Sequence, residues 1–438
     1  MEIAPLKTDL PLDDVGQEMY ELIAELHPLC RSITGDGVRN TLSILKKYIP
    51  LDVHEIPSGT PVFDWTVPRE WNIRDAYVKN STGERIIDFN RSNLHVVSYS
   101  TPLRRTVRLE ELREHLHTLP DSPDWIPYRT SYYTENWGFC LSHKQLLELT
   151  DEEYEVCIDA SLEDGYLTYG EYYLPGETDD EVLLSCHVCH PSLCNDNLSG
   201  IALVALLARY LGSFSLRYSY RFLFIPGTIG SITWLCLNEQ QVCRIKHGLI
   251  VACVGDLGKS TYKKSRQGHA EVDKAVAHVL KHSGQAYDIV DFSPYGYDER
   301  QFCSPGFNLP VGCFMRTPHG RFPEYHTSAD NLDLVQPASL ADSFSKCLST
   351  LHILENNKVY LNQNPKCEPQ LGKRGLYGAI GGQTARRVHE MAMLWVLNFS
   401  DGYHTLLDIA EKSDVEFHAI KVAAEVLLAN GLLKEVVV

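Results

Sequence analysis

Histidines and carboxylates follow predicted strands at several separate points of the sequence. His187 ends the apolar run EVLLSCH, Asp256 follows GLIVACV, and Asp196 precedes a predicted helix. His326 follows the loop after LPVGCFM. Ligands of α/β sheets bind beyond the carboxyl ends of strands, so we expect these four side chains to meet. A few imidazoles and carboxylates that leave one position open for water are typical of hydrolytic zinc sites.

The elements that position these residues alternate between strands and helices from about residue 156. Buried strands are indicated by four runs: EVLLSCHV, YRFLFI, GLIVACV and LPVGCFM. Helical periodicity occurs in GIALVALLARYL, AEVDKAVAHVLKHS and LADSFSKCLSTLHIL. This alternation predicts an α/β fold with a mixed, mostly parallel sheet and helices on both faces.

The rest of the chain divides by composition. Residues 15–49 have helical periodicity, whereas 51–155 hold short β-rich runs between Pro, Gly, Asn and Asp turns. Residues 357–383 indicate a linker, and beyond it three short helical runs precede GLLKEVVV, a terminal strand pair or wing. The predicted domains are a catalytic domain from residues 1–50 and 156–356, a β-rich insert at 51–155 and a winged helix at 372–438.

The order of these residues resembles that of the M28-type zinc aminopeptidases. Shared features are His187, an N-D-N-x-S-G segment with Asp196, a turn at Pro226-Gly227-Thr228, Asp256, and Y-H-T-x-x-D from Tyr325. The run from Tyr297 to Phe302 resembles that family's S-D-H-x-x-F segment. With LCRSITGDGVR and CHVCHPSLCNDNLSG, the chain resembles a bacterial aminopeptidase-like subgroup that has a β-rich insert and a C-terminal winged helix. The resemblance implies a zinc aminopeptidase/phosphorylase-like fold.

The resemblance also implies a ligand set. By position, the first metal would be bound by His187, Asp196 and Asp256, and the second by Asp196 and His326. Three positions depart from the family. Gly227 replaces the general-base Glu, Thr228 replaces a second-metal Glu, and Cys189 replaces the Asp that orients the first histidine. We therefore expect one zinc rather than two.

Glycine cannot accept a proton, so hydrolysis needs another base. Glu299 is the first candidate and Glu324 the second, with Asp298 also expected to face the site. A solvated charged loop is the alternative for residues 298–300. Two further alternatives stay open, namely acidification of water by the metal alone and a catalytically weak protein.

Substrate contacts are expected from the segment before His326. Glu324 and Tyr325 immediately precede it, and Arg316 could meet a substrate carboxylate. A surface role for Arg316 and an orienting role for Tyr325 are the plain alternatives.

Simpler explanations exist for some of these residues. Asp196 before a helix is also a normal N-cap, which accounts for one residue but not the set. Cys186-x-x-Cys189-His190 matches the c-type haem pattern, but haem attachment normally requires export. Packing around the site is the better explanation of these cysteines.

The formal net charge of −17 disfavours nucleic-acid binding as a main role. The predicted recognition helix, FHAIKVAAEVLLANG, has one Lys and one Glu, whereas groove-reading helices carry Arg, Lys, Asn or Gln. We expect the winged helix to serve packing or dimerisation, so a homo-oligomer through it or through the insert is open.

The first residues, MEIAPLKTDLPLDD, do not resemble a signal peptide, and no run is long and apolar enough to span a membrane. Thirteen cysteines without an export signal indicate reduced thiols and a cytoplasmic protein.

The candidate metal ligands and the resemblance favour a zinc hydrolase that cleaves an amide next to the free amino group of a peptide or an aminoacylated small molecule. The alternative is an aminopeptidase-fold protein that has lost catalysis and serves binding or assembly.

Overall fold

The computed structural model describes residues 6, 8, 10–376 and 384–436 of the chain. They form two compact units. The first comprises Met1–Ala270 and Ala286–Ser345, and the second comprises Glu271–Gln285 and Lys346–Val438. Every residue of the predicted metal site belongs to the first unit.

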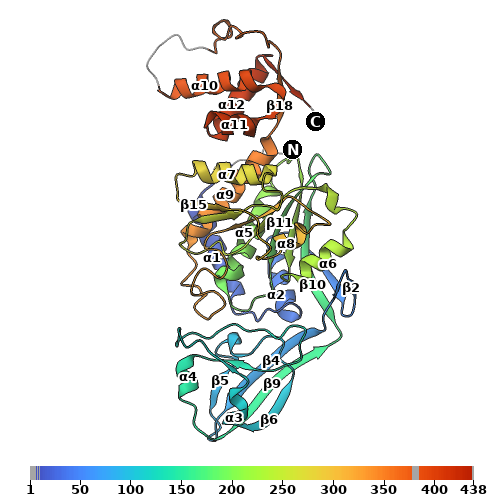
Figure 1. Cartoon of the computed structure of the whole chain (residues 1–438), viewed down its shortest axis with the longest axis vertical. Helices are drawn as coiled ribbons and strands as arrows, with labels where there is room; N and C mark the ends of the chain where they lie inside the picture. Colours follow the sequence, from blue (N-terminus) through green and yellow to red (C-terminus); the bar gives the residue numbers. More distant parts are fainter. Residues whose placement is uncertain (1–5, 7, 9, 377–383, 437–438) are drawn as a thin grey trace. The chain divides into compact units, whose positions relative to one another are not determined.

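An eight-stranded sheet is the core of the first unit, in the order β1-β10-β12-β11-β13-β16-β14-β15 (Figure 1). In that order the strands are Asp52–Pro57, Tyr166–Leu174, Ser219–Ile225, Glu181–His187, Ile245–Val251, Val311–Met315, Ser260–Lys263 and Tyr287–Val290. The four central strands β12, β11, β13 and β16 are parallel. Strand β10 runs antiparallel to β1 and β12, and β14 runs antiparallel to β16 and parallel to β15. This confirms the predicted mixed, mostly parallel sheet.

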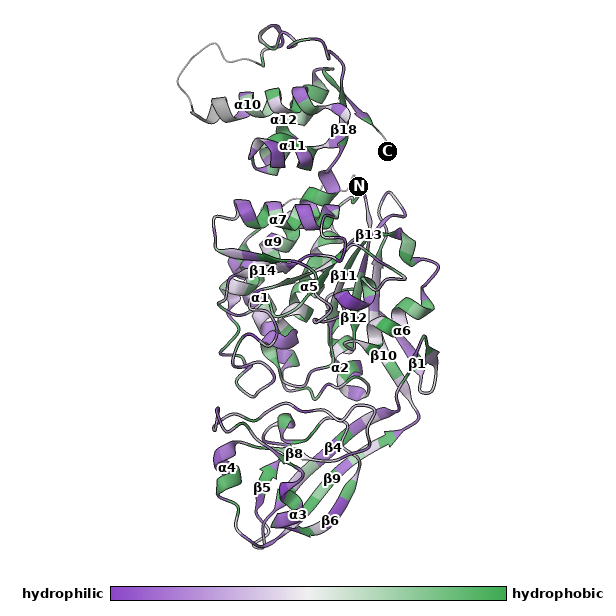
Figure 2. Cartoon of the chain, viewed as in Figure 1, coloured by the Kyte–Doolittle hydropathy of each residue, from purple (hydrophilic) through white to green (hydrophobic). Residues whose placement is uncertain are grey.

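Helices cover this sheet because its central strands are apolar on both faces. Every residue of β11 and β12 is buried, and Figure 2 shows these strands and α5 mainly as hydrophobic. Ile232 and Trp234 of α6 belong to one apolar cluster with Leu183 and Leu223 of the strands. Helix α5 packs on β11, β12 and β13 outside that cluster, hence on the opposite face. The helices of this unit are α1 (Leu12–Leu26), α2 (Asp36–Leu45), α3 (Leu109–Arg113), α4 (His143–Leu147), α5 (Ser199–Leu211), α6 (Ile229–Leu237), α8 (Glu299–Phe302) and the start of α9 (Pro337–Asn356).

The insert has its own antiparallel sheet, in the order β5-β4-β9-β6. These strands are Arg85–Asp88, Glu70–Lys79, Glu153–Glu163 and Leu103–Arg108, with two short pairs, β2 (Pro61–Val62) with β3 (Trp65–Thr66) and β7 (Leu116–His117) with β8 (Phe139–Cys140). The pair β1/β10 of the main sheet continues along the chain into the pair β4/β9 of the insert (Figure 1). The predicted boundary at residue 155 therefore falls within β9, and the domain limits remain a prediction.

The second unit contains α7 (Glu271–His282), the end of α9 and the C-terminal elements. Helices α10 (Thr384–Phe399), α11 (Leu406–Ser413) and α12 (Phe417–Ala429) accompany a sheet in the order β18-β17-β19. The strands are Asp401–Thr405, Val359–Asn362 and Leu433–Val436. The sequence predicts a linker over 357–383. In the structure, strand β17 lies within this range and pairs with β18 on one side and with β19 on the other. Residues 377–383 of that linker and 437–438 of the predicted wing lie outside the described residues.

No helix among residues 6, 8, 10–376 and 384–436 is long and apolar enough to cross a membrane. Residues 1–5, 7 and 9, on which the prediction about a signal peptide partly rests, lie outside the described residues.

Candidate metal centre

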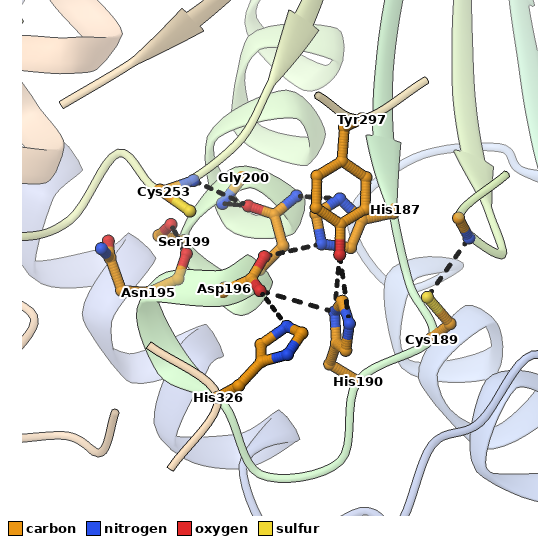
Figure 3. Close-up of polar contacts among 12 residues, drawn as sticks. His187, Cys189, His190, Asn195, Asp196, Ser199, Gly200, Cys253, Tyr297 and His326 are labelled. Atoms are coloured by element: carbon orange, nitrogen blue, oxygen red, sulfur yellow. Dashed lines mark hydrogen bonds and ion pairs between the residues drawn. The ribbon is translucent and has the colours of Figure 1, made fainter. Parts of the chain in front are cut away.

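The carboxylate of Asp196 lies between two imidazoles. Nε2 of His187 is 2.8 Å from its Oδ1, and Nε2 of His326 is 3.0 Å from its Oδ2 (Figure 3). His187 ends β11, Asp196 lies in a single π-turn (Cys194–Leu198) that leads into α5, and His326 follows β16. The sequence places these three residues at one edge of the sheet, and the structure brings their side chains together there.

A third imidazole, that of His190, belongs to the same group. Its Nδ1 lies 3.9 Å from Oδ2 of Asp196, and its ring centroid lies 4.9 Å from that of His187 and 5.0 Å from that of His326. Ligand atoms of His187, His190 and Asp196 all lie within 4.8 Å of one another. The sequence analysis considered His190 only in a haem-like pattern and missed it. A second histidine three residues beyond the strand end was the signal.

Asp256, predicted as a metal ligand, accepts hydrogen bonds from the surrounding loops. Its Oδ1 accepts hydrogen bonds from Gly258 N at 2.6 Å and from Thr317 Oγ1 at 2.7 Å. Its Oδ2 accepts bonds from Asn195 Nδ2 at 2.9 Å and from Thr317 N at 3.2 Å. Both oxygens therefore hold loops together, and Asp256 is not in the compact group of ligand atoms.

Aromatic rings fix the orientation of the imidazoles. Tyr297 stacks on His187 with centroids 3.8 Å apart, and its hydroxyl lies 3.1 Å from Nε2 of His190. Tyr325 stacks on His326 at 3.9 Å, and Tyr128 of the insert meets both His190 and His326 edge-on. Tyr325 therefore lies beside His326, and its role in substrate binding stays a prediction. Burial raises the pKa of Tyr297 well above its usual value, so its hydroxyl keeps its proton.

Hydrogen bonds to the backbone hold the turn that presents Asp196. Asn197 donates from Nδ2 to Val251 O at 3.0 Å, and its Oδ1 accepts from Cys253 N at 3.1 Å. A Cβ on Gly200 would lie 2.5 Å from Val251 O, so only glycine permits α5 to approach β13 this closely. These contacts explain the N-D-N-x-S-G segment structurally.

Arg31, from the segment LCRSITGDGVR, supports the second histidine. Its buried guanidinium donates from Nε to the carbonyl oxygen of His190 at 2.9 Å and from Nη1 to Leu26 O at 2.7 Å. The connection between α1 and α2 thus fixes the loop that carries His190.

Several non-glycine residues at the site have a positive φ. They are Ser192 at 43°, Thr228 at 65°, Cys253 at 51° and His326 at 56°. Such conformations cost of order 1–3 kcal/mol each and cluster at functional sites. Their occurrence in the loops around the histidines marks this edge of the sheet as the functional one.

The predicted base, Glu299, has a structural partner. Its Oε1 lies 2.5 Å from Nζ of Lys263, and its Oε2 accepts from Tyr297 N at 3.1 Å. Both members of the pair are buried. Glu299 therefore positions the backbone of Tyr297 and does not face the cavities, because Lys263 occupies its other oxygen.

Asp298 is also directed into the protein. Its Oδ1 accepts hydrogen bonds from Thr228 N at 2.7 Å and from Ser231 Oγ at 2.9 Å. Burial raises the pKa of Asp298, with Thr228, Ser231 and the nearby His187 opposing that rise. The structure assigns it to the turn that contains Gly227 and Thr228, which corrects its prediction as a catalytic residue.

The remaining predicted substrate contacts are not in the cavities. Arg316 is buried and donates to Oδ2 of Asp342 at 2.6 Å, at the start of α9. Glu324 contributes its carbonyl oxygen to Thr327, and its side chain lines neither of the two cavities beside the histidines. Arg316 therefore stabilises the fold here, because its charge is already paired.

Gly227 is closely packed at the position where the M28-type pattern has a glutamate. Its N–H donates to Cys189 Sγ at 3.2 Å. A Cβ at this position would lie 3.1 Å from Cε1 of Tyr297 and 3.3 Å from that sulfur. Burial raises the pKa of Cys189 to about 12, so its thiol is protonated and packs against the turn.

Two cavities meet at His190. One, of about 360 Å³, has an aromatic wall made of Trp65, Tyr132, Tyr133, Tyr297 and Tyr325. The other, of about 430 Å³, lies against the insert and also reaches His326. Within the described part of the chain, no aspartate or glutamate lines either of them. Neither cavity therefore offers a carboxylate to a substrate ammonium.

Burial and the closeness of the side chains to one another shift the pKa values of Asp196 and His190. Burial opposes ionisation of Asp196, but the imidazoles of His190, His187 and His326 outweigh it and hold its pKa well below its usual value. Burial lowers the pKa of His190 well below its usual value, so it is neutral and can bind a metal. An ionised carboxylate beside the neutral imidazole of His190 is a protonation state in which both groups can bind a metal cation.

Comparisons with known proteins agree with this fold. A model of the DUF4910 family, a domain of unknown function, matches residues 20–357, and a winged helix-turn-helix model matches residues 358–435. A Clostridium acetobutylicum protein described as a polysaccharide biosynthesis protein with an aminopeptidase-like domain is 58% identical over 421 residues, which are 96% of this chain and 97% of that protein.

Solved structures extend the comparison. A crystal structure from Clostridium acetobutylicum, described as a peptidase, has a TM-score of 0.93 at 56% identity and covers 97% of both chains. A zinc aminopeptidase from Bacillus subtilis has a TM-score of 0.57 at 12% identity, covering 77% of this chain and 95% of that one. The resemblance to M28-type zinc aminopeptidases is thereby confirmed, as is the C-terminal winged helix.

Proposed function

The chain belongs to the DUF4910 family, and we propose that its aminopeptidase-like unit is a single-zinc hydrolase of amide bonds. The observation that carries the proposal is the buried group of His187, His190 and Asp196, joined by His326 on the second carboxylate oxygen. The rings and the carboxylate of these four residues are directed at one another. Packing alone does not explain such an arrangement of polar groups.

The donor set fits zinc in type and spacing. Zinc binds imidazole and carboxylate at about 2.0–2.2 Å in tetrahedral geometry, which places ligand atoms roughly 3.3 Å apart. The three imidazoles lie 2.8, 3.0 and 3.9 Å from the oxygens of Asp196. Small side-chain rotations bring these values to the required spacing. One carboxylate among the donors is too few for a second metal, because Gly227 and Thr228 supply none.

A bound zinc would supply Lewis acidity to a carbonyl oxygen and lower the pKa of water. The protein contributes orientation and a proton donor. Tyr297 points its hydroxyl at His190, at the point where the two cavities meet, so it can donate to the oxygen that becomes negative as an amide carbonyl is attacked. His190 lines both cavities and lies beside the substrate position.

The substrate is an amide, but the free amino group expected next to it has no partner among the described residues. Glu299 is paired with Lys263, and neither cavity contains a carboxylate. An N-acylated sugar has an amide bond and no ammonium. The description of the Clostridium relative as a polysaccharide biosynthesis protein and the aromatic wall, which suits the apolar face of a sugar ring, both support such a substrate over a peptide.

A protein that retains the metal but not the catalysis is the second candidate. It is favoured by one observation, the replacement of the usual base by Gly227 with no carboxylate in its place. Its role would be binding or assembly, with the winged helix as the packing module.

Zinc content and hydrolysis test the proposal together. The full-length protein should bind one zinc per chain. It should release carboxylic acid from N-acylated amino sugars more readily than nitroaniline from aminoacyl-nitroanilides. Zinc binding without turnover of any amide would establish the second candidate. Absence of stoichiometric zinc would discard both.

A further inference from the structure

The cavity on the insert side of the histidines is built from a segment of the insert that contacts the metal centre directly. Tyr128 N donates to the carbonyl oxygen of His326 at 2.8 Å. Ser328 N donates to Ile126 O at 2.8 Å, and Ile126 N donates to Ser328 Oγ at 3.0 Å. The insert therefore forms one wall of the site, fixed to the same loop that carries His326.

The other side of this segment is fixed to the body of the insert. Ser98 N donates to the carbonyl oxygen of Arg129 at 2.9 Å, and Ser131 N donates to Ser98 O at 2.9 Å. The backbone of Arg129 is thus held between the insert and the His326 loop. Arg129, an exposed residue, is among those that line the cavity of about 430 Å³ that ends at His190 and His326.

The charge of this cavity is unusual for the chain as a whole. The protein has 57 acidic and 40 basic residues, yet Arg129 is the one charged side chain of fixed sign lining the cavity in the described part of the chain. The other titratable side chains there are His117, His190, His326 and two tyrosines. Arg129 therefore gives this cavity a local positive charge in a chain whose formal net charge is −17.

Arg129 has no carboxylate partner among residues 6, 8, 10–376 and 384–436, unlike its neighbours in the insert. Arg69 pairs with Glu135, and Arg105 pairs with Glu111 at 2.6 Å. An arginine fork matches the geometry of carboxylate and phosphate oxygens. The guanidinium in this cavity is therefore available to a ligand.

Uncharged donors accompany it. Oδ1 of Asn136 accepts from Trp137 N at 2.8 Å, so its Nδ2 hydrogens remain for another acceptor. The hydroxyl of Thr130 also lines the cavity. Together with the fork of Arg129, these groups form a set of hydrogen-bond donors for an oxyanion.

We propose that this cavity binds an oxyanion of the substrate, a carboxylate or a phosphate, with Arg129 as its charged partner. The inference rests on the proposed function in one respect, namely that the anion belongs to the same molecule as the amide. The amide lies where the two cavities meet at His190, the ring lies against Tyr297 and Tyr325, and the anionic group extends towards the insert. Specificity for a charged substrate is then a property of the insert.

Anion binding by the zinc-loaded full-length protein tests this without any turnover. Inorganic phosphate and acetate are titrated calorimetrically at low ionic strength into wild type, Arg129→Gln, Arg129→Lys and Arg113→Gln. Arg113 is an exposed insert arginine outside the cavity and serves as the matched control. We expect Arg129→Gln to weaken the preferred anion at least about tenfold, Arg129→Lys to weaken it less, and Arg113→Gln to leave it unchanged.

The preferred anion identifies the source, phosphate for a phosphorylated substrate and acetate for a carboxylate. Equal affinities in wild type and Arg129→Gln would overturn the proposal, because the anion would then bind the metal alone. So would the absence of binding by either anion. Zinc stoichiometry in the same samples separates the two ideas: loss of zinc with retained anion binding contradicts the hydrolase and not the anion site.

Discussion

Oδ2 of Asp330 accepts a hydrogen bond from the backbone N–H of Asp196 at 2.9 Å, although the two residues are 134 positions apart. Its other oxygen, Oδ1, accepts from Asn195 N at 2.6 Å. The carboxylate of Asp196, at the centre of the candidate metal site, is therefore placed by a second, buried carboxyl group that does not face the other candidate ligand atoms. Groups of this kind fix metal ligands and affect affinity strongly.

Asp330→Asn should lower zinc affinity by about 10- to 100-fold while the protein stays folded. An asparagine can present only one oxygen to the two amides, and its NH2 group opposes the other one. Competitive chelator titration measures the effect. Asp333→Asn, at an exposed position three residues later, is the control and should bind zinc as wild type does. Equal affinity in the two variants would show that Asp330 does not position Asp196.

A ligand set that includes His190 and not Asp256 predicts opposite effects on zinc binding for substitutions of these two residues. His190→Ala removes a donor from the compact group, so zinc affinity should fall by more than the roughly 100-fold expected for a supporting residue. Asp256→Asn disturbs the loops that Asp256 joins and lowers stability, but the purified folded protein should keep one zinc per chain. The zinc content of each variant after dialysis distinguishes the two outcomes. Loss of zinc from Asp256→Asn but not from His190→Ala would identify Asp256 as the ligand.

Tyr297→Phe should reduce kcat by about 100-fold or more without loss of zinc. The phenyl ring keeps the stacking on His187, whereas the hydroxyl 3.1 Å from His190 is removed. Steady-state kinetics on an amide that the wild type cleaves, with zinc analysis of the same sample, measures both. A change confined to KM would contradict a role of the hydroxyl in the chemical step.

Gly227→Glu should lower activity and stability, not restore a base. Even the Cβ of Gly227→Ala meets Tyr297 at 3.1 Å and Cys189 Sγ at 3.3 Å, and overpacking of this kind costs about 1–3 kcal/mol. Urea denaturation of the alanine variant measures the cost. A rise in hydrolysis by the glutamate variant would instead identify a degenerate aminopeptidase.

His247 makes the protein sensitive to acid. Burial lowers its pKa from 6.5 to about 3, and neither ring nitrogen has a hydrogen-bond partner in the described structure. The folded state thus excludes a proton that the unfolded chain binds below pH 6.5, so stability falls as pH decreases from 6.5 to 3, by about 1.4 kcal/mol per unit.

His247→Phe should therefore move the acid unfolding midpoint, followed by circular dichroism, to lower pH. His269→Gln, at an exposed site, is the control. An unchanged midpoint in His247→Phe, with neutral-pH stability preserved, would contradict this cause.

The sequence predicted what depends on strand order. His187, Asp196 and His326 follow strands that meet at one edge, so their meeting could be inferred from periodicity and order alone. The fate of Asp256 and Glu299 could not, because it depends on partners such as Thr317 and Lys263 whose proximity arises only from loop conformation. The cavity that includes Arg129 was hidden for the same reason, since an inserted segment reaches the site across nearly 200 residues of chain.

The insert is attached to the rest of the first unit at several separated places. They include the β1/β10 to β4/β9 ribbon, the bridge between Pro127 and Thr327, and the hydrogen bond between the hydroxyls of Ser32 and Ser98. A module attached through one ribbon can move relative to the rest of the protein, whereas attachment at separated points restrains such motion. Access to the histidines is then regulated by side chains at the cavity mouths rather than by domain motion. Exchange of the segment around Arg129 between relatives would therefore change the lining of the cavity without changing the candidate metal ligands.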